Sequence, residues 1–446
     1  MEDKGLNGDH DLLKMMGSIE VPESLEAFRL GLQERHGNAI RKRRDFSVQS
    51  LPFSCEPIPW YDLGYRPVDS ITGPTRTLAY ASGAYFVQDA GSLLALALCG
   101  ADKQTKNPLL VCDLCAAPGA KASALLEHIH QSGGFLLANE VIGSRVAALG
   151  YNLSRTGSNR FAITSLDPEH LVEKIGAVFD LVLVDAPCSG QAMLSRGKQT
   201  SSSFSQQQVE HSASRQNRIL DAASRLTKPG GRLVYSTCTF AEAENEDQVR
   251  RLMEQGIAEA LPQKQLEEYQ TDSGCYRLWP HQHRCAGAFG SIVQITHDEK
   301  ERSMRKKPSR QRYPKISVDD WYSCDFARDR LHATKASLLA WPEDAPEWTE
   351  MIAVNGPEIA YRTGQTWKPA HAGAIRELTG RISSQTCEID AEKANLCMQG
   401  QTLSVDINGW ATVIYDGRPL GWIKASQGIG KNHLPSHARF NGDLVP

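Results

Sequence analysis

The feature that most constrains the fold is a regular alternation of short apolar runs and helical segments between residues 108 and 240. The runs typical of buried strands are LLVCDL (109–114), GFLLAN (134–139), FAITS (161–165), FDLVLVD (179–185) and GRLVYSTCT (231–239). Helical spacing separates them, as in 121–130 and in 206–231, and we expect the latter helix to end at its Pro-Gly-Gly. Strands that alternate with helices predict a doubly wound α/β fold with a parallel sheet.

Two cysteines follow two of these strands in differently shaped turns. Cys188 lies in DAPCSG, after the run 179–185, and Cys238 lies in YSTCT, at the end of the run 231–239. The carboxyl ends of parallel strands form the rim where ligands bind in such folds. One free cysteine could simply fill a core. Two at neighbouring strand ends indicate thiols that act on a bound substrate.

The turn after the first strand has the character of a cofactor-binding turn. It reads DLCAAPGAK from Asp113 to Lys121, and its small residues let a ligand approach the backbone where a helix begins. The spacing fits neither the phosphate-binding GxxxxGK[ST] loop nor the dinucleotide-binding GxGxxG motif. A nucleoside cofactor with a carboxylate tail therefore suits this turn better than a dinucleotide.

Acidic residues follow the next three strands. Glu140 follows the second strand, where a carboxylate can accept both hydroxyls of a ribose. Asp167 follows the third strand, where it could reach an adenine amine, and Asp185 closes the fourth. Any one of them would ordinarily be a solvated loop residue. Together, at successive strand ends, they predict a binding site.

These motifs resemble the Sun-type (NOL/NOP/Sun) family of RNA cytosine-5 methyltransferases, in the bacterial branch that acts on small-subunit ribosomal RNA. The matching segments, in family order, are YFVQDAGS, DLCAAPGAK, ANEVIGSRVAAL, DLVLVDAPCSG, YSTCTFAEAENE and RLWPHQHRCAGAF. The C-terminal LGWIKASQGIGKNHLP is similar to that branch's RNA-binding tail. The resemblance implies a Rossmann-like methyltransferase core, S-adenosylmethionine as the cofactor and RNA as the partner.

The resemblance also implies roles for individual residues. Cys238 would be the nucleophile, Cys188 would assist release of the product, and Asp185 would hydrogen-bond the cytosine edge. No metal is implied. The implied cofactor site consists of Cys115, Ala116, Ala117, Pro118, Gly119, Ala120, Lys121, Glu140, Asp167 and Asp185. Family members usually read PGGKT in this turn, so we expect the methyl group of Ala120 to weaken cofactor affinity without abolishing it.

The chemistry explains why thiols would be needed. Carbon 5 of cytosine is too electron-poor to attack a methyl sulfonium directly, and a thiolate that adds to carbon 6 makes carbon 5 nucleophilic. The base must be unstacked to receive attack on one face and the methyl group on the other, which favours RNA loops or opened helices.

Four alternatives stay open at this point. Cys188 could be the nucleophile, as in DNA cytosine-5 methyltransferases with a Pro-Cys turn. The RNA could be tRNA rather than 16S ribosomal RNA, or the protein could be a catalytically weak RNA-binding factor in ribosome assembly. A zinc site at Cys112 and Cys115 is disfavoured, because residues three apart on a strand face opposite sides and no second such pair follows.

The rest of the chain predicts four segments. We expect an N-terminal region at 1–105, a catalytic domain at 106–300, a basic linker at 301–344 and a β-rich, PUA-like RNA-binding domain at 345–446. The stretch 51–67 (LPFSCEPIPWYDLGYRP) is Pro-rich, so we expect it to be irregular. We expect 275–295 to form an antiparallel hairpin, and Asn408-Gly409 and Asp416-Gly417 to be hairpin turns.

The charge of the chain lies in clusters. The net charge is −3, yet Arg41-Lys42-Arg43-Arg44 and 302–315 are strongly basic, and such runs are either solvated or form a track for phosphates. The sequence contains no run of about 18 apolar residues and no signal-like start, and its 11 cysteines are irregularly spaced. These features predict a cytoplasmic protein with reduced thiols, which we expect to be a monomer.

Overall fold

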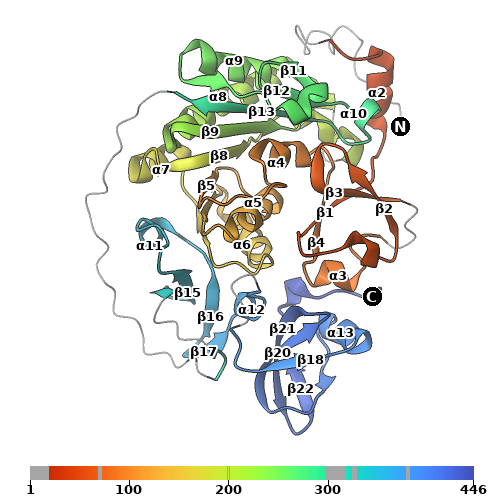
Figure 1. The fold of residues 1–446 in the computed structure, drawn as a ribbon, viewed down its shortest axis with the longest axis vertical. Helices are drawn as coiled ribbons and strands as arrows, with labels where there is room; N and C mark the ends of the chain where they lie inside the picture. Colours follow the sequence, from red (N-terminus) through yellow and green to blue (C-terminus); the bar gives the residue numbers. More distant parts are fainter. Residues whose placement is uncertain are drawn as a thin grey trace.

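The described part of the chain contains a nine-stranded central sheet and three smaller sheets (Figure 1). This computed structural model describes residues 20–68, 73–197, 199, 201–296, 318, 320–323, 329–377 and 382–446. The whole basic segment 302–315 and the rest of the expected linker up to residue 317 therefore lie outside the described residues. Among the helices that are described, none is long and apolar enough to cross a membrane.

The central sheet confirms the expected α/β architecture. Its strands run in the order β11-β12-β13-β9-β8-β5-β6-β7, and β10 pairs with β13. The parallel strands are β5 (Leu110–Asp113), β6 (Phe135–Asn139), β7 (Phe161–Thr164), β8 (Phe179–Asp185) and β9 (Thr227–Thr237). The antiparallel strands are β10 (Ala258–Ala260), β11 (Gln270–Asp272), β12 (Cys275–Leu278) and β13 (Ala288–Ile295). The expected hairpin is thus β12–β13, which pairs with β9.

Helices cover both faces of the sheet because successive strand residues point to opposite sides. Val111 and Leu183 pack on one face, whereas Cys112 and Val184 pack on the other. The first face is covered by α4 (Leu93–Cys99), α5 (Ala120–His130) and α6 (Val146–Ser154). The second is covered by α7 (Pro168–Ile175), α8 (Gln206–Leu226) and α9 (Glu246–Glu254).

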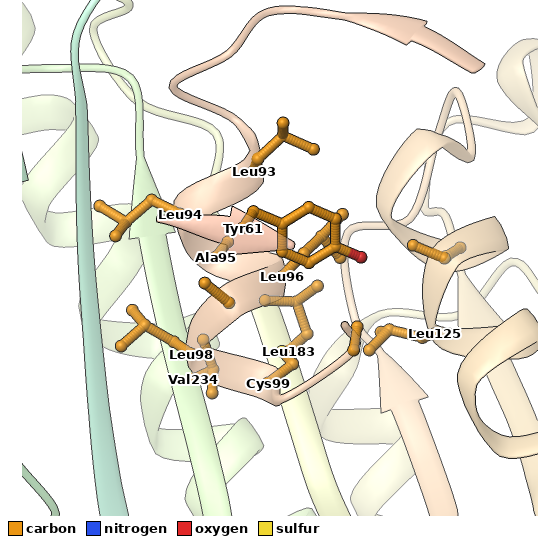
Figure 2. Close-up of a cluster of buried hydrophobic side chains, with 14 of the residues drawn as sticks. Tyr61, Leu93, Leu94, Ala95, Leu96, Leu98, Cys99, Leu125, Leu183 and Val234 are labelled. Carbon is orange, nitrogen blue, oxygen red and sulfur yellow. The ribbon is translucent and has the colours of Figure 1, made fainter. Parts of the chain in front are cut away.

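Helix α4 joins the N-terminal sheet to the central sheet. All seven of its residues are buried, which is the pattern of a helix enclosed on every side. Figure 2 shows its leucines between Tyr61 of β3 (Tyr61–Val68) and the residues Leu183 and Val234 of the central strands. Burial of each leucine stabilises the fold by about 1.5–3 kcal/mol. The N-terminal region is therefore packed on the catalytic core rather than tethered to it.

The N-terminal region contains a four-stranded antiparallel sheet in the order β2-β3-β1-β4. Its elements are β1 (Ala39–Lys42), β2 (Ser54–Ile58), β3 (Tyr61–Val68) and β4 (Tyr85–Gln88), with the helices α2 (Leu25–Gln33) and α3 (Leu78–Ala81). The expectation that 51–67 is irregular was wrong, because β2 and β3 form a hairpin there. Pro57 lies beside the register shift of that hairpin, where a strand tolerates a missing N–H group.

The basic cluster at 41–44 does not form a phosphate track. Arg41 is 1% exposed and pairs with Glu127 at 2.6 Å, and Arg43 is 3% exposed and pairs with Glu377 at 2.9 Å. Arg44 donates to two backbone carbonyls. These guanidinium groups hold the N-terminal sheet against other elements of the fold.

Helix α8 ends at Leu226, five residues before the end we expected. The Pro-Gly-Gly lies instead inside β9, where the pairing with β8 shifts register between Thr227 and Arg232. Such a bulge accommodates a proline that cannot donate to the ladder. A Cβ atom on Gly231 would lie 2.8 Å from the carbonyl oxygen of Lys228, so glycine is required there.

A four-stranded sheet begins inside the expected linker. Its strands are β14 (Asp329–Ala333), β15 (Ser337–Pro342), β16 (Glu358–Thr363) and β17 (Thr366–Pro369), with the helix α11 (Thr349–Ile352). The interpretation of 329–342 as linker was therefore wrong. The sheet packs on the central core, and the indole of Trp341 donates to the carbonyl of Phe161 at 2.7 Å. Val354 and Asn355 cover the edge of β7 through hydrogen bonds to Ile163.

A five-stranded sheet forms the C-terminal end of the chain. Its elements are β18 (Thr386–Glu388), β19 (Leu403–Ser404), β20 (Gly409–Tyr415), β21 (Arg418–Ser426) and β22 (Ile429–Asn432), with the helices α12 (His371–Ala374) and α13 (Ala391–Met398). Asp416-Gly417 is the expected hairpin turn between β20 and β21, with φ values of 47° and 75°. Asn408-Gly409 is not a hairpin turn, because β19 pairs with β22 rather than with β20.

Candidate active site

A cavity of about 470 Å³ lies at the carboxyl ends of the parallel strands. Seven of the residues expected at the site line it: Cys115, Ala117, Glu140, Asp167, Asp185, Cys188 and Cys238. The remaining expected residues do not line it: Ala116, Pro118, Gly119, Ala120 and Lys121. The strand ends thus bring the acids and the two thiols to one rim, as the alternating pattern predicts.

The two thiols lie in contact. The Sγ atoms of Cys188 and Cys238 are 3.2 Å apart, and the backbone N–H of Cys238 donates to Cys188 Sγ at 3.4 Å. This proximity follows from the sheet, because β8 and β9 are parallel neighbours in which Asp185 pairs with Ser236. Both turns therefore leave the sheet at the same level.

Asp185 is held at the same rim by two neighbours. Its carboxylate accepts from Lys121 Nζ at 2.7 Å and from Ser236 Oγ at 2.8 Å. Burial lowers the pKa of Lys121, but the Asp185 carboxylate outweighs it and raises that pKa above its usual value. Lys121 therefore stays a cation, although it does not line the cavity itself.

The electrostatic surroundings of the two thiols differ. The pKa of Cys188 is raised well above that of an ordinary thiol by its hydrogen bond with Cys238, by burial, and by the negative charges of Cys238 and Glu244. The charge of Cys238 in turn raises the pKa of Lys121, so the ammonium lies within electrostatic range of that sulfur. A thiolate is therefore disfavoured on Cys188.

Glu244 links the two cysteine turns, a role that its place in an acidic run does not reveal. Its carboxylate is fully buried and accepts from the Ser189 N–H at 2.9 Å and from Gln216 Nε2 at 2.9 Å. The hydroxyls of Ser189 and Thr239 are 2.8 Å apart and join the turns directly. Burial raises the pKa of Glu244.

The two residues after Glu244 hold the Cys238 turn from its other side. Asn245 Oδ1 accepts from Thr237 Oγ1 at 2.6 Å, and its Nδ2 donates to the Thr239 carbonyl at 3.0 Å. Glu246 forms a buried ion pair with Arg277, which donates to the Phe240 carbonyl at 2.9 Å. The sequence Glu-Asn-Glu therefore contacts the residues on both sides of Cys238.

The cofactor turn places its glycine where only glycine fits. Gly119 has a φ of 112°, and a Cβ atom there would lie 3.1 Å from Cβ of Asn152. Ala120 is the first residue of α5 and has no positive φ, so its methyl group causes no backbone strain. The turn is closed by the Ala116 N–H, which donates to the Asn139 carbonyl at 2.9 Å.

The acids of the cofactor side are arranged differently from one another. Glu140 is buried, accepts from the Ile142 N–H at 2.9 Å and pairs with Arg145 at 3.1 Å. Asp167 caps α7 through the Glu169 N–H at 3.0 Å and is partly exposed. Beside them, the apolar side chains of Val141 and Ile142 line the cavity and are 55% and 50% exposed.

Asp113 is a further carboxylate that the strand-end argument could have found, because it closes β5 as Asp185 closes β8. It is 1% exposed, and among the described residues neither oxygen has a side-chain hydrogen-bond partner. Burial raises its pKa to about 7, and the charges of Asp185 and Glu140 act in the same direction. Cys112, just before it, is buried in the core of the other face. The described residues contain no group of three or more metal-binding side chains.

Comparison with known sequences places this geometry in a family. The profile described as 16S rRNA methyltransferase RsmB/F matches residues 100–294, and that described as Methyltransferase RsmF PUA domain matches 384–440. A relative from Escherichia fergusonii, named Ribosomal RNA small subunit methyltransferase F, is 32% identical over 90% of this chain and 88% of its own length. A relative of the same name from Shewanella amazonensis is 27% identical over 85% of each chain. With the one from Cronobacter sakazakii, 32% identical, the match covers 56% of this chain and only 54% of the relative.

Solved structures agree on the fold of the core. A methyltransferase homologue from Pyrococcus horikoshii has a TM-score of 0.55 at 24% identity, over 65% of this chain and 96% of that one. NSun6 from Pyrococcus horikoshii with SFG has a TM-score of 0.52 at 18% identity, over 66% and 96%. At these identities the likeness establishes a Rossmann-like methyltransferase core, to which a PUA-like C-terminal domain is added.

Proposed function

Because the chain belongs to the 16S rRNA methyltransferase RsmB/F family, we propose that it methylates carbon 5 of a cytosine in 16S ribosomal RNA through a covalent bond to Cys238. S-adenosylmethionine is the cofactor of this methyltransferase. The observation that carries the proposal is the contact between two unlike thiols, 3.2 Å apart, on the rim that also holds Asp185.

The unlike surroundings of the thiols support different roles for them. The Lys121 ammonium lies within electrostatic range of the Cys238 sulfur, and a thiolate is the form of cysteine that adds to carbon 6. Cys188 lies beside Glu244 and keeps its proton. This distribution supports Cys238 as the nucleophile over the alternative in which Cys188 attacks.

The reaction then follows from the positions of the side chains. Cys238 Sγ forms a bond to carbon 6, and Asp185, fixed by Lys121 and Ser236, hydrogen-bonds the cytosine edge so that carbon 6 faces the sulfur. S-adenosylmethionine supplies the methyl group when it is bound. Transfer of the carbon 5 proton to a solvent water then lets the ring double bond re-form as the bond between carbon 6 and sulfur breaks. The Cys188 thiol hydrogen-bonds the departing Cys238 sulfur.

The residues of the cavity fit this cofactor. A volume of about 470 Å³ accommodates a nucleoside with an amino acid tail. Glu140 can accept ribose hydroxyls, Val141 and Ile142 offer an apolar surface to a purine, and Asp167 lies where it could accept from an exocyclic amine.

The experiment is bisulfite sequencing of total RNA from a strain that lacks the gene, complemented with the wild type or with Cys238→Ala. We expect one cytosine in 16S ribosomal RNA to lose protection in the deletion strain and to regain it only with the wild type. Loss of protection in a tRNA instead would establish the tRNA alternative. No change at any cytosine would favour a non-catalytic assembly factor. We also propose that the protein works as a cytoplasmic monomer, which gel filtration with light scattering tests.

A further inference from the structure

The wall of the cavity at the rim carries three arginine side chains, those of Arg145, Arg215 and Arg218. Arg145 pairs with Glu140 at 3.1 Å, and Arg218 lies 3.8 Å from Asp167. Within the described residues, the side chain of Arg215 forms neither an ion pair nor a hydrogen bond. Arg215 therefore brings to the cavity a positive charge that no acid of the described chain balances by direct contact.

Helix α8 holds Arg215 beside the turn that carries Cys188. The next residue of the helix, Gln216, is buried and donates through Nε2 to the Pro187 carbonyl at 3.2 Å. Pro187 and Cys188 line the cavity together with Arg215. Arg215 itself is exposed, so solvent and ligands can reach its guanidinium group. This arginine is therefore placed next to the thiols, at an accessible part of the cavity wall.

The charge of Arg215 also acts across the cavity. Cys115 follows β5, which is the strand that pairs with β8, and it lines the same cavity. Burial raises the pKa of the Cys115 thiol, and the positive charge of Arg215 acts against this rise. The guanidinium group on α8 is thus within electrostatic range of the turn after β5, as expected for a side chain that faces the cavity.

Two anions could meet this charge, the carboxylate of the cofactor and a phosphate of the RNA. The turn from Asp113 to Lys121 leads into α5, which covers the first face of the sheet, and the first N–H groups of a helix suit a carboxylate. Helix α8, which carries Arg215, covers the opposite face. A base drawn into the cavity leaves its two phosphates at the opening, because they remain part of the strand. The position of Arg215 beside the Cys188 turn therefore favours a phosphate.

We propose that Arg215 binds a phosphate that flanks the target cytosine and so holds the unstacked nucleotide beside Cys238. A guanidinium group presents paired N–H donors that match two phosphate oxygens, and such bidentate pairs fix position as well as adding affinity. No ion pair with an acid of the described chain has to be broken when the phosphate binds. The inference deepens the proposed function and rests on it in taking RNA as the substrate.

The first test compares the wild type with R215Q in the affinity for 16S ribosomal RNA, with S-adenosylhomocysteine bound so that no turnover occurs. We expect binding that is weaker by about 10-fold, as for the loss of one hydrogen bond to a charged group. The plot of log K against log salt should be shallower by about 0.7 to 0.9, the contribution of one phosphate contact. R215K keeps the charge and should keep the slope. The matched control R362Q removes an exposed arginine of β16, outside the cavity lining, and should bind as the wild type does.

A second test locates the contact on the RNA. In a synthetic fragment that carries the cytosine identified by bisulfite sequencing, each of the two phosphates beside this cytosine is replaced in turn by an uncharged methylphosphonate. One of the replacements should weaken binding by the wild type by about 10-fold and leave binding by R215Q unchanged, because the variant has already lost the contact. A replacement several nucleotides away should affect both proteins equally.

Failure of this proposal is distinct from failure of the proposed function, because binding is measured without turnover and a wild type that forms no adduct counts only against the latter. Unchanged affinity and slope in R215Q, in protein that melts as the wild type does, would overturn the proposal. Equal losses in both proteins at each flanking methylphosphonate would also overturn it. Calorimetry should find the same affinity for S-adenosylmethionine in both proteins. A 10-fold loss there, with RNA affinity intact, would overturn the proposal and assign Arg215 to the carboxylate of the cofactor.

Discussion

The rim has a thiol side, formed by the two cysteine turns, and a cofactor side, formed by the cofactor turn and its acids. The two sides differ in how their buried polar groups are hydrogen-bonded. On the thiol side, Glu244, Ser189 and Thr239 bond to one another and tie the Cys188 turn to the Cys238 turn. On the cofactor side, Asp113 is buried, and among the described residues neither of its oxygens has a side-chain partner. A hydrogen-bonded network fixes geometry, whereas a buried carboxylate without such partners costs stability. The comparison indicates that hydrogen bonds within the protein position the thiols, whereas the cofactor side keeps a buried carboxylate whose pKa is raised.

The largest expected effect tests the difference between the thiols themselves. Cys238→Ala should abolish methylation and form no adduct, because no other group can add to carbon 6. Cys188→Ala should still attack and methylate, but it should release slowly and leave protein crosslinked to RNA. Denaturing gels of the two variants incubated with RNA and S-adenosylmethionine measure both outcomes.

The double variant Cys188→Ala/Cys238→Ala is the control for this experiment, and it should resemble Cys238→Ala. A trapped complex only in the Cys238 variant would transfer the nucleophile role to Cys188. If no variant formed an adduct despite normal binding of RNA and cofactor, the thiols would not attack the RNA, and the non-catalytic alternative would be favoured.

On the cofactor side, the pH dependence of stability tests the cost of Asp113. Its pKa of about 7 in the folded protein lies above the value of about 3.9 in an unfolded chain. The folded state therefore binds the proton more tightly, and stability falls as the pH rises from about 4 to about 7. Three pH units of difference correspond to about 4 kcal/mol at most.

The variant Asp113→Asn cannot titrate and should gain stability over the wild type across this window, with little difference at pH 4. Urea unfolding at several pH values measures it. The exposed Asp406→Asn is the matched control and should follow the wild-type profile. If Asp113→Asn gave the same pH profile as the wild type, the carboxylate would have a partner that satisfies its charge.

The network on the thiol side predicts a smaller change from Glu244→Gln. The Ser189 N–H and Gln216 Nε2 both donate to the same oxygen, Oε2. A glutamine oxygen in that position is a neutral acceptor, and hydrogen bonds to a charged group are stronger than neutral ones, so we expect a loss of about 1–3 kcal/mol in stability. Displaced thiols should lower kcat by about 10- to 100-fold. Glu242→Gln is the matched control, since Glu242 is also buried but pairs with Arg250.

Two measurements separate positioning from folding in this variant. Urea unfolding gives the stability, and the adduct formed with Cys188→Ala as background gives the rate of attack by Cys238. A normal rate of adduct formation in Glu244→Gln would show that the network stabilises the fold without placing the thiols.

The comparison also shows what a sequence can and cannot predict. The rim positions of Cys188, Cys238 and Glu140 follow from local patterns, because each comes directly after an apolar run of strand length. The bond between Glu244 and Ser189 joins residues 55 positions apart, and no spacing in the chain encodes it. Arg43, which pairs with a residue 334 positions away, was mistaken for surface charge for the same reason.

Sequence patterns also gave wrong predictions where one short motif is compatible with two backbone structures. Pro-Gly-Gly ends many helices, but here it forms a bulge within β9 because the pairing with β8 resumes at Arg232. Asn408-Gly409 has the composition of a hairpin turn, yet β19 pairs across the sheet with β22. Which of the two structures forms depends on the strands that pair with the motif, and these strands lie elsewhere in the chain.

The smallest expected effect concerns the cofactor turn, where this chain has Ala120. Its methyl group lies at the start of α5, outside the cavity lining and without strain. Ala120→Gly should therefore leave the affinity for S-adenosylmethionine unchanged and cost about 0.5–1 kcal/mol of stability, because glycine loses more backbone entropy in a helix. Calorimetry and urea unfolding measure the two quantities. Gly119→Ala provides the contrast, since its φ of 112° and the contact with Asn152 leave no room for a methyl group. Tighter cofactor binding by Ala120→Gly would mean that the Ala120 methyl group does lower the affinity for S-adenosylmethionine. The cofactor side of the rim would then differ from the thiol side by a steric clash as well as by its buried carboxylate.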